Sequence, residues 1–352
     1  MTATTDQRSW YLGGPEEVGD GVVRLPMPVG VRELHAVNVY VLSDRDGAID
    51  LIDAGDASEV AVHTLDEALR GIGGGVDAVR RVLVTHVHPD HYTLAPPIRA
   101  RAGATVHLGS GERENVRQIN RLIRGEREVQ VLADLERVGA TALTRELEPG
   151  RLNASRGGDE LAEPDVWTVD GERIRAGRGD VTALATPGHT RGHVVFHDQE
   201  QGRYFSGDHV LPHITPSIGF ESAPVSSALA DYLGSLRRLL ELPDGVLLPA
   251  HGPTAPSTHA RVRELLDHHE TRLAQTLDAV QDRGSTPFEV ARRLTWTRHE
   301  RRFAELHAWH RFLASTETAA HLEVLVDRRL LDRAPGGGGA DVYRPAGGCR
   351  VA

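Results

Sequence analysis

The stretch that decides the fold is Leu83-Val84-Thr85-His86-Val87-His88-Pro89-Asp90-His91, where three histidines and one aspartate follow an apolar run. Side chains two positions apart in an extended segment point the same way, so His86 and His88 can hold one ion. If a helix begins near Asp90, then Asp90 and His91 turn toward a second point. Imidazole and carboxylate ligands suit Zn²⁺ and similar divalent metals. The stretch therefore predicts a metal site at the end of a buried strand.

Three later segments repeat this context, with a polar residue at the end of an apolar strand. They are Ala185–Thr190, which contains His189, Phe205–Asp208, and Leu247–Gly252, which contains His251. Strand ends at one edge of a sheet lie close in space. We therefore expect all four segments to converge on one site.

The order of the predicted elements indicates an α/β layered fold. The predicted strands are Gly21–Leu25, Val37–Leu42, Ala48–Ile52, Val82–Val84, Thr105–Leu108, Trp167–Val169, Val181–Ala185, Val194–His197, Arg203–Phe205 and Val246–Leu248. The predicted helices between them are Ser58–Arg70, Pro96–Ala102 and Asp231–Leu242. The charged segment Glu112–Glu148 delays the return of the sheet. We interpret it as a helical insertion, at about residues 110–150, that shapes access to the site.

From about Pro256 the pattern becomes nearly all helical. The predicted helices are Arg261–Asp282, one that begins at Thr286, Arg302–Phe312 and Glu317–Leu330. Thr286-Pro287-Phe288-Glu289 has the threonine cap, first-turn proline and acidic third position of a helix start. The glycine-rich residues 334–340 predict a flexible tail over 334–352.

Composition limits the classes of function. The 352 residues carry a formal net charge of −10, so the chain as a whole is a poor partner for nucleic acid. Every strongly basic side chain is arginine, which by itself says little about chemistry. The lone Cys349 excludes an internal disulfide and a cysteine-rich zinc cluster. The first residues lack the pattern of a signal peptide, and no apolar run reaches about 18 residues. We expect a cytoplasmic protein with no membrane span.

The metal-site segments resemble those of a known family. His86-Val87-His88-Pro89-Asp90-His91 is similar to the HxHxDH motif of the metallo-β-lactamase fold superfamily. Thr186–His193, Ser206-Gly207-Asp208 and Ala250-His251-Gly252 resemble its later motifs, in the same order, over roughly residues 20–255. The resemblance implies a four-layer αβ/βα sandwich as the catalytic domain, residues 1–255. The ligand set is similar to those of glyoxalase II and N-acyl-homoserine lactonases.

The resemblance also implies roles for the individual ligands. A first metal would be held by His86, His88 and His189, and a second by Asp90, His91 and His251. Asp208 would bridge both, and with Asp90 it would act as a catalytic residue that fixes the metal spacing and orients the nucleophile. Two divalent ions are implied, zinc in the first place and iron or manganese as alternatives, with a hydroxide between them.

Five further residues are candidates around the site. The resemblance places Asp53 beside the metals, where it would orient a ligand histidine, and His193 nearby as a non-ligand. Tyr92, His209 and His213 are candidate substrate-binding residues, with simple packing or surface positions as the alternatives. Residues 92–95 stand where relatives often have a glycine pair. The resemblance therefore does not predict the floor of the pocket, although it does predict the ligands.

Residues 256–333 resemble the small winged-helix-like domain of endoribonuclease-type β-lactamase-like proteins. The features that carry this resemblance are Thr286–Ala291 and Thr318–Leu325. A winged helix suggests nucleic-acid binding, but residues 256–352 contain 15 arginines against 13 acidic residues, which favours it only weakly. A local basic run is formed by Arg292, Arg293, Arg298, Arg301 and Arg302, for which a solvated helix end is the simpler interpretation.

The sequence thus predicts a dinuclear metal-dependent hydrolase that cleaves an ester-like bond, with a thioester or lactone in a small-molecule or acyl-thioester substrate. Alternatives are a phosphodiesterase or endoribonuclease, an iron-dependent persulfide dioxygenase-like enzyme, and a noncatalytic DNA-binding regulator. A complete ligand set disfavours the regulator, and the lack of an export signal disfavours a dedicated β-lactamase. Family resemblance also suggests a homodimer.

Overall fold

The computed structural model describes residues 10–29, 35–126, 130–147, 160–223, 225–297 and 299–347. The chain divides into two compact units. Unit 1 comprises residues 1–116, 161–216 and 235–263, and unit 2 comprises residues 117–160, 217–234 and 264–352. This division differs from the boundary predicted after residue 255, because most of the predicted insertion groups with the C-terminal region. Arg298 and Cys349 lie outside the described residues.

In the described part of unit 1, a first sheet has seven strands in sequence order. They are β1 (Glu16–Glu17), β2 (Val22–Pro28), β3 (Ala36–Ser43), β4 (Ile49–Ile52), β5 (Val79–Val84), β6 (Thr105–Gly109) and β7 (Val166–Thr168). Pairs from β1 to β4 are antiparallel, and pairs from β4 to β7 are parallel. Strand β3 is buried on both faces at all positions but the last, which explains its continuous apolar run.

A second sheet of unit 1 has the order β12-β11-β10-β9-β8. Its strands are β8 (Arg173–Ala176), β9 (Gly179–Ala185), β10 (Val194–Asp198), β11 (Arg203–Gly207) and β12 (Val246–Pro249). All neighbours are antiparallel except β11 and β12, which are parallel. The sequence did not predict β8, whose short alternation of arginine with Ile174 and Ala176 is a weak strand signal.

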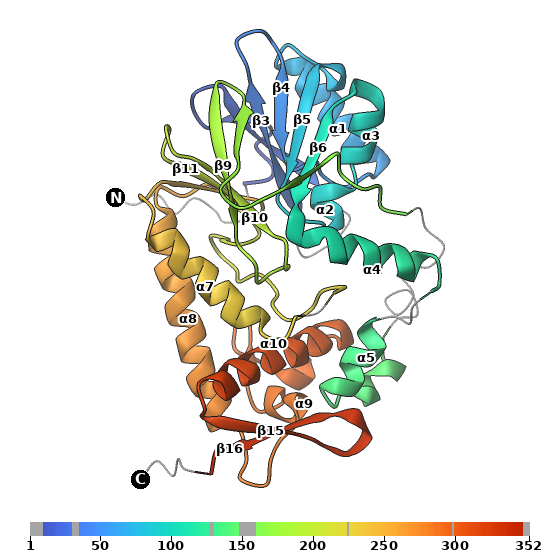
Figure 1. The fold of residues 1–352 in the computed structure, drawn as a ribbon, viewed down its shortest axis with the longest axis vertical. Helices are drawn as coiled ribbons and strands as arrows, with labels where there is room; N and C mark the ends of the chain where they lie inside the picture. Colours follow the sequence, from blue (N-terminus) through green and yellow to red (C-terminus); the bar gives the residue numbers. More distant parts are fainter. Residues whose placement is uncertain are drawn as a thin grey trace. The chain divides into compact units, whose positions relative to one another are not determined.

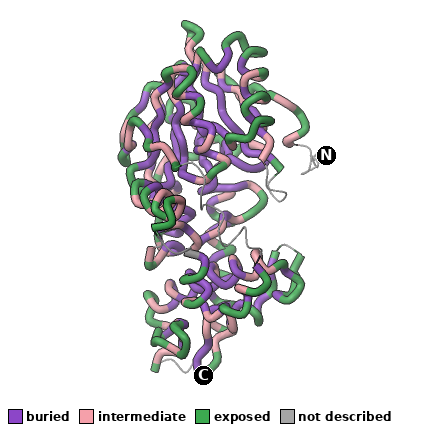
Figure 2. Tube along the Cα trace, turned by 90° about the vertical axis from the view of Figure 1, so that its right-hand side faces the viewer, coloured by how far each residue is buried: buried purple, intermediate pink, exposed green. Residues whose placement is uncertain are grey.

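The two sheets pack face to face around one core. Buried side chains from both sheets form a single cluster, in which the rings of Tyr40 and Phe205 meet edge to face at 5.2 Å. Helices α1 (Glu59–Gly71) and α3 (Ala95–Ala102) lie beside the first sheet (Figure 1). Figure 2 shows long buried runs of the chain. Ser58 caps α1 by accepting a hydrogen bond from the Ala61 amide. The predicted α/β sandwich is confirmed.

The strand directions bring the predicted ligand segments to one edge of each sheet. Parallel β4 and β5 end beside each other, which places Asp53 next to the segment that starts at His86. In the second sheet, parallel β11 and β12 end just before Asp208 and His251 respectively. The turn between antiparallel β9 and β10 lies at this same edge, because β10 begins where β11 ends. The short helix α2 (Pro89–Tyr92) starts within the motif, as predicted.

Unit 2 is mainly helical in its described residues. Its elements include the end of α4 (Arg113–Ile123), α5 (Gln130–Arg137), the start of α7 (Ala228–Leu240), most of α8 (Thr258–Asp278), α9 (Pro287–Ala291) and α10 (Ala308–Asp327). Its core holds Leu135, Val138, Leu143 and Phe312, and the ring of Phe220 packs edge to face on Phe312 at 5.4 Å. No helix in the described part of the chain is long and apolar enough to cross a membrane.

The predicted helices 302–312 and 317–330 are wrong in their boundaries, because one helix, α10, spans Ala308–Asp327. The polar run at 315–318 favours a break, yet its hydroxyls bond back to carbonyls within the helix. Ser315 donates to the Arg311 carbonyl at 2.7 Å. Thr318 donates to the Ala314 carbonyl at 2.8 Å. These bonds satisfy the hydroxyls, so the residues stay buried inside one continuous helix.

Two hairpins in unit 2 were not predicted. Strands β13 (Thr295–Trp296) and β14 (Arg301–Arg302) pair where helix was expected to begin. Strands β15 (Leu331–Pro335) and β16 (Asp341–Pro345) pair through most of the tail that we predicted to be flexible. The glycines of this tail form the turn of the second hairpin, because glycine accepts the positive φ seen at Gly338 and Gly339. Residues 348–352 of the tail lie outside the described residues.

The start of α9 agrees with the sequence. The side chain of Thr286 accepts a hydrogen bond from the Glu289 amide, and the Glu289 side chain accepts one from the Thr286 amide. The predicted capping pattern is therefore confirmed.

Candidate metal centre

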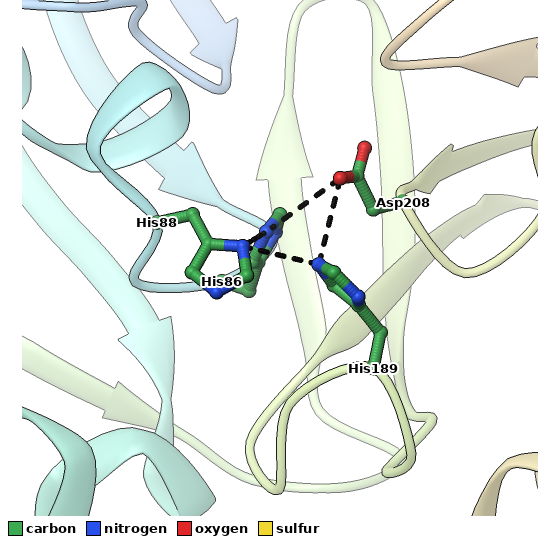
Figure 3. Close-up of side chains that lie close together, drawn as sticks. All are labelled: His86, His88, His189 and Asp208. Carbon is green, nitrogen blue, oxygen red and sulfur yellow. Dashed lines mark hydrogen bonds and ion pairs between the residues drawn. The ribbon is translucent and has the colours of Figure 1, made fainter. Parts of the chain in front are cut away.

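Three histidines and Asp208 form the first group of metal-donor atoms (Figure 3). Nδ1 of His88 lies 2.9 Å from Nε2 of His86 and 3.1 Å from Nε2 of His189. Nitrogen ligands about 2.0–2.1 Å from a tetrahedral zinc ion are roughly 3.3 Å apart. Donor atoms of all four residues lie within 4.8 Å of one another, so this group is compact enough to hold one shared ion.

Asp208 faces a second donor group, made of Asp90, His91 and His251. Its Oδ2 lies 3.5 Å from Nε2 of His189, in the first group. Its Oδ1 lies 3.3 Å from Nε2 of His251 and 3.7 Å from Nε2 of His91, in the second group. Each carboxylate oxygen thus points to a different donor group, which is the geometry that a bridging ligand requires.

The second group, and the Asp208 oxygen that faces it, contain buried polar atoms without a hydrogen-bond partner. Oδ2 of Asp90, Nε2 of His91, Oδ1 of Asp208 and Nε2 of His251 have no hydrogen-bond partner among the described residues. Leaving one buried polar group unsatisfied costs about 1–3 kcal/mol. Four such atoms pointing to one place fit a divalent cation, which would satisfy all of them at once. The residues present therefore fit the metal ions that the sequence predicts.

The histidines of the site differ in the direction in which their surroundings shift the pKa. Burial lowers the pKa of His88 to about 3 and holds the pKa of His86 well below its usual range, so both imidazoles are neutral and able to bind metal. Burial also acts to lower the pKa of His91, but the carboxylates of Asp53, Asp90 and Asp208 outweigh it and raise this pKa to about 10. These carboxylates concentrate negative charge where the second group would hold a cation.

Asp53 orients the ring of His91. Its Oδ2 accepts a hydrogen bond from Nδ1 of His91 at 2.8 Å, which turns Nε2 of that ring toward the donor group. Its Oδ1 accepts from the Thr85 amide at 2.8 Å. Asp53 itself adopts a positive φ of 61°. Aspartate tolerates this conformation better than most residues, and the side chain lies where the sequence analysis expected it.

His193 lies beside Asp208 rather than within either donor group. Its Nε2 accepts a hydrogen bond from the Asp208 amide at 3.2 Å. Its Nδ1 is therefore the protonated nitrogen, and it lies 2.9 Å from the Thr186 hydroxyl. His251 is held similarly, because its Nδ1 donates to the Ala36 carbonyl at 2.8 Å. These bonds fix which nitrogen of each ring faces inward.

The three candidate substrate-binding residues lie in different environments. Tyr92 is fully buried and donates its hydroxyl proton to the Ala162 carbonyl at 2.5 Å. His209 is fully buried, and His213 is exposed. A role in substrate binding stays a prediction for all three. For Tyr92, the contact with the chain itself corresponds to the packing alternative.

Sequence reasoning missed two residues that lie next to the ligands or to the turn that carries one. Thr85 precedes the motif directly, and its hydroxyl lies 3.0 Å from Asp53 and 3.1 Å from Nδ1 of His86. Glu112, assigned to the start of the insertion, is buried in unit 1 beside the His189 turn. Threonine has no distinctive spacing around metals, but its position directly before the first histidine was a usable signal.

Comparison with known proteins identifies the family. The model described as the metallo-beta-lactamase superfamily matches residues 32–251, which contain all seven predicted ligands. The chain therefore belongs to the metallo-β-lactamase superfamily, and its histidine–aspartate cluster is the metal site of a metallo-hydrolase.

Three relatives show how far the likeness extends. The probable metallo-hydrolase YqjP of Bacillus subtilis is 24% identical, over 86% of this chain and 91% of its own. The crystal structure of the metallo-beta-lactamase family protein TTHA1429 from Thermus thermophilus is 27% identical with a TM-score of 0.75, covering 92% of this chain and 98% of that one. An atrochrysone carboxyl ACP thioesterase of Aspergillus fumigatus is 32% identical over 35% of this chain and 34% of its own.

Proposed function

We propose that this protein is a dinuclear hydrolase of an ester-like bond, with a thioester as the leading substrate and a lactone as the next. The observation that carries the two-ion assignment is the orientation of Asp208, whose two oxygens face different donor groups. The ester-like substrate is supported by the likeness to an ACP thioesterase and by a ligand set of five histidines and two aspartates. Zinc is the proposed metal.

The chain's own residues prepare the site for this chemistry. When bound, two divalent ions would lower the pKa of a water molecule and polarise the carbonyl of the substrate. His86, His88 and His189 would hold one ion, and Asp90, His91 and His251 the other. Asp208 sets the spacing between the two groups, and Asp53 keeps Nε2 of His91 turned inward.

Buried protein groups protect this arrangement. All seven ligands except His88 and Asp90 are buried, and those two are partly so. Burial excludes water that would otherwise compete for the donor atoms, and it strengthens electrostatic interactions. Few water molecules would therefore compete with the scissile carbonyl of the substrate for the metal ions.

A panel of substrates tests the proposal. Purified protein is assayed with acyl thioesters, lactones, phosphodiesters and RNA while its metal content is measured. We expect thioester or lactone turnover that rises with zinc content toward two ions per chain. Asp208→Ala should abolish it, and the variant Glu200→Ala, at an exposed carboxylate, should not. Turnover of RNA or phosphodiesters alone would overturn the ester assignment, and one iron per chain would overturn the dizinc assignment in favour of the dioxygenase-like alternative.

A phosphodiesterase or endoribonuclease is the second candidate, and one feature of unit 2 favours it. Arg292, Arg293 and Arg302 line a cavity of about 260 Å³ together with Phe303. Arginine binds phosphate through paired donors, and an aromatic wall suits a base. The distinguishing measurement is salt-dependent RNA binding by wild type and by Arg292→Ala. Equal binding by the two proteins would remove this candidate's support.

A further inference from the structure

A buried carboxylate touches the turn that carries His189 without belonging to either donor group. Glu112 is fully buried at the end of the short 3-10 helix η2 (Ser110–Glu112), which follows β6. Its Oε1 accepts a hydrogen bond from the hydroxyl of Thr190, the residue directly after His189. Its Oε2 accepts from the Asn115 amide group at 2.7 Å. Neither its burial nor its partners are explained by the metal ligands themselves.

The backbone around Glu112 is pressed against the same turn. A Cβ at Gly111 would lie 2.6 Å from the Arg191 carbonyl oxygen, and one at Gly192 would collide with the Glu112 amide. Real Cβ atoms essentially never approach this closely, so only glycine permits the contact. The segment that holds Glu112 and the turn after His189 are therefore in direct backbone contact.

The turn has little freedom to adjust. Thr190 is fully buried, and its carbonyl accepts the Gly188 amide at 3.0 Å, which closes a tight loop around His189. Adjacent Cα atoms are about 3.8 Å apart, so a shift of Thr190 moves the His189 ring with it. The position of Nε2 of His189, 3.1 Å from His88 and 3.5 Å from Asp208, depends on this loop.

We propose that Glu112 is a positioning residue for the first donor group: through Thr190 it fixes the turn that presents His189 to the metal. This goes beyond the proposed hydrolysis, because it concerns how the chain holds an ion and not which bond is cleaved. It rests on the histidine–aspartate cluster binding metal. Partners one step removed from metal ligands typically contribute about 10–100-fold to metal affinity.

Thr190 offers the sharpest pair of variants. Thr190→Val removes the hydroxyl and keeps the shape, whereas Thr190→Ser keeps the hydroxyl. Metal-free protein is titrated with Co²⁺ in the presence of a competing chelator, and the visible spectrum of bound Co²⁺ is recorded as a measure of coordination geometry. We expect Thr190→Val and Glu112→Ala each to weaken binding at one of the two positions by about tenfold or more, with an altered spectrum. Thr190→Ser should bind like wild type.

The pair is tested for coupling with the double variant. If Glu112 acts through Thr190, Glu112→Ala with Thr190→Val should lose no more affinity than the worse single variant. A matched control is Asp198→Asn at the far end of β10, another buried carboxylate, which pairs with Arg203 at 2.9 Å. It should lower the melting temperature and leave Co²⁺ affinity unchanged, which separates positioning from general support of the fold.

The outcomes distinguish this inference from the metal assignment. Wild-type protein that binds no Co²⁺ would overturn both. Wild type that binds two ions, with Thr190→Val and Glu112→Ala binding them equally well and giving the same spectrum, would overturn only the role of Glu112. Should Glu112→Ala fail to fold, Thr190→Val decides the question, because it removes a single hydroxyl. Substrate turnover is not used, so failure of the ester assignment leaves the result intact.

Discussion

Two groups of buried histidines in this chain have opposite surroundings. In unit 1, Nε2 of His91 and Nε2 of His251 lie near the carboxylates of Asp90 and Asp208 and have no hydrogen-bond partner among the described residues. In unit 2, the histidine pair is His269 and His321, whose Nδ1 and Nε2 atoms lie 3.2 Å apart. Nδ1 of His321 donates to the Glu317 carbonyl in the same helix. Among the described residues, this pair joins no group of three metal donors.

The difference shows what marks a metal site in a chain with 19 histidines. Burial alone does not, because both groups are buried and burial lowers the pKa of His321, to about 4, as it does that of His88. The mark is several orphaned donor atoms, carboxylate oxygens among them, that point to one place. The pair in unit 2 leaves a single such atom, Nε2 of His269, and among the described residues it belongs to no group of three metal donors.

The largest expected effect follows from removing the shared carboxylate. Asp208→Ala should lose most bound metal and lower hydrolysis by more than about 100-fold, because a bridging ligand matters more than the partner of a ligand. His321→Gln, the corresponding change in the other histidine group, should leave metal content unchanged. Metal analysis of both variants checks this. An Asp208→Ala protein with both ions and normal turnover would break the comparison.

A smaller effect is expected from changing Asp53, a carboxylate that hydrogen-bonds a ligand histidine but is not itself a ligand. Asp53→Ala should lower metal affinity by about 10–100-fold, because the ring of His91 loses the acceptor that orients it. Asp53→Asn is the matched variant, since asparagine also tolerates the positive φ at this position. It should retain more affinity than the alanine variant. Chelator competition measures both, and equal affinities for all three proteins would contradict the orienting role.

Metal removal should affect the two units unequally. An ion that binds only the folded state, at about 100 times its dissociation constant, stabilises that state by about 2.7 kcal/mol. Stripping the protein with a chelator should therefore increase hydrogen exchange in β5 and β11, which lead into ligands. Exchange in α10 should change little. A uniform increase across both units would show that the stability of unit 2 depends on the metal.

The smallest effect is the pH dependence of stability that comes from the histidine pair of unit 2. Burial lowers the pKa of His321 from 6.5 to about 4, and that of His269 to about 2. Positive charge from Arg272 and His268 lowers both pKa values further. The hydrogen bond from His321 to the Glu317 carbonyl acts in the opposite direction and raises the pKa of His321. Between pH about 6.5 and about 4 the unfolded chain binds more protons, so this contribution to stability is lost as pH falls.

Hydrogen exchange of the α10 amides measures this loss. Protection should decrease from pH 6.5 toward pH 4 after correction for the intrinsic exchange rate, and His321→Gln should flatten the dependence. A profile that is flat in wild type, or unchanged in the variant, would mean that these histidines do not control the stability of α10.

The sequence was sufficient to predict those site residues whose positions are determined by the ends of strands. His86, Asp208 and His251 each follow an apolar strand, and strand direction alone brings such residues to one edge. The division of the ligands into two donor groups also follows from the motif. Pro89 starts a helix after His88, and this helix turns Asp90 and His91 away from His86 and His88.

What could not be predicted depends on contacts between distant residues. The continuity of α10 depends on hydroxyl groups of Ser315 and Thr318 that bond back to carbonyls, and their polarity alone favours a break. Glu112 supports the His189 turn across 78 residues of sequence, with no local pattern to reveal it. Unit 2 gathers three separated segments, so no single change in composition marks where it begins.

The most direct test of the metal centre is anomalous X-ray scattering at the zinc edge, from crystals of the zinc-loaded protein. Two peaks are predicted, one among His86, His88 and His189 and one among Asp90, His91 and His251, with a different oxygen of Asp208 beside each. A single peak, or zinc bound only outside these seven residues, would contradict the assignment of a dinuclear centre bridged by Asp208.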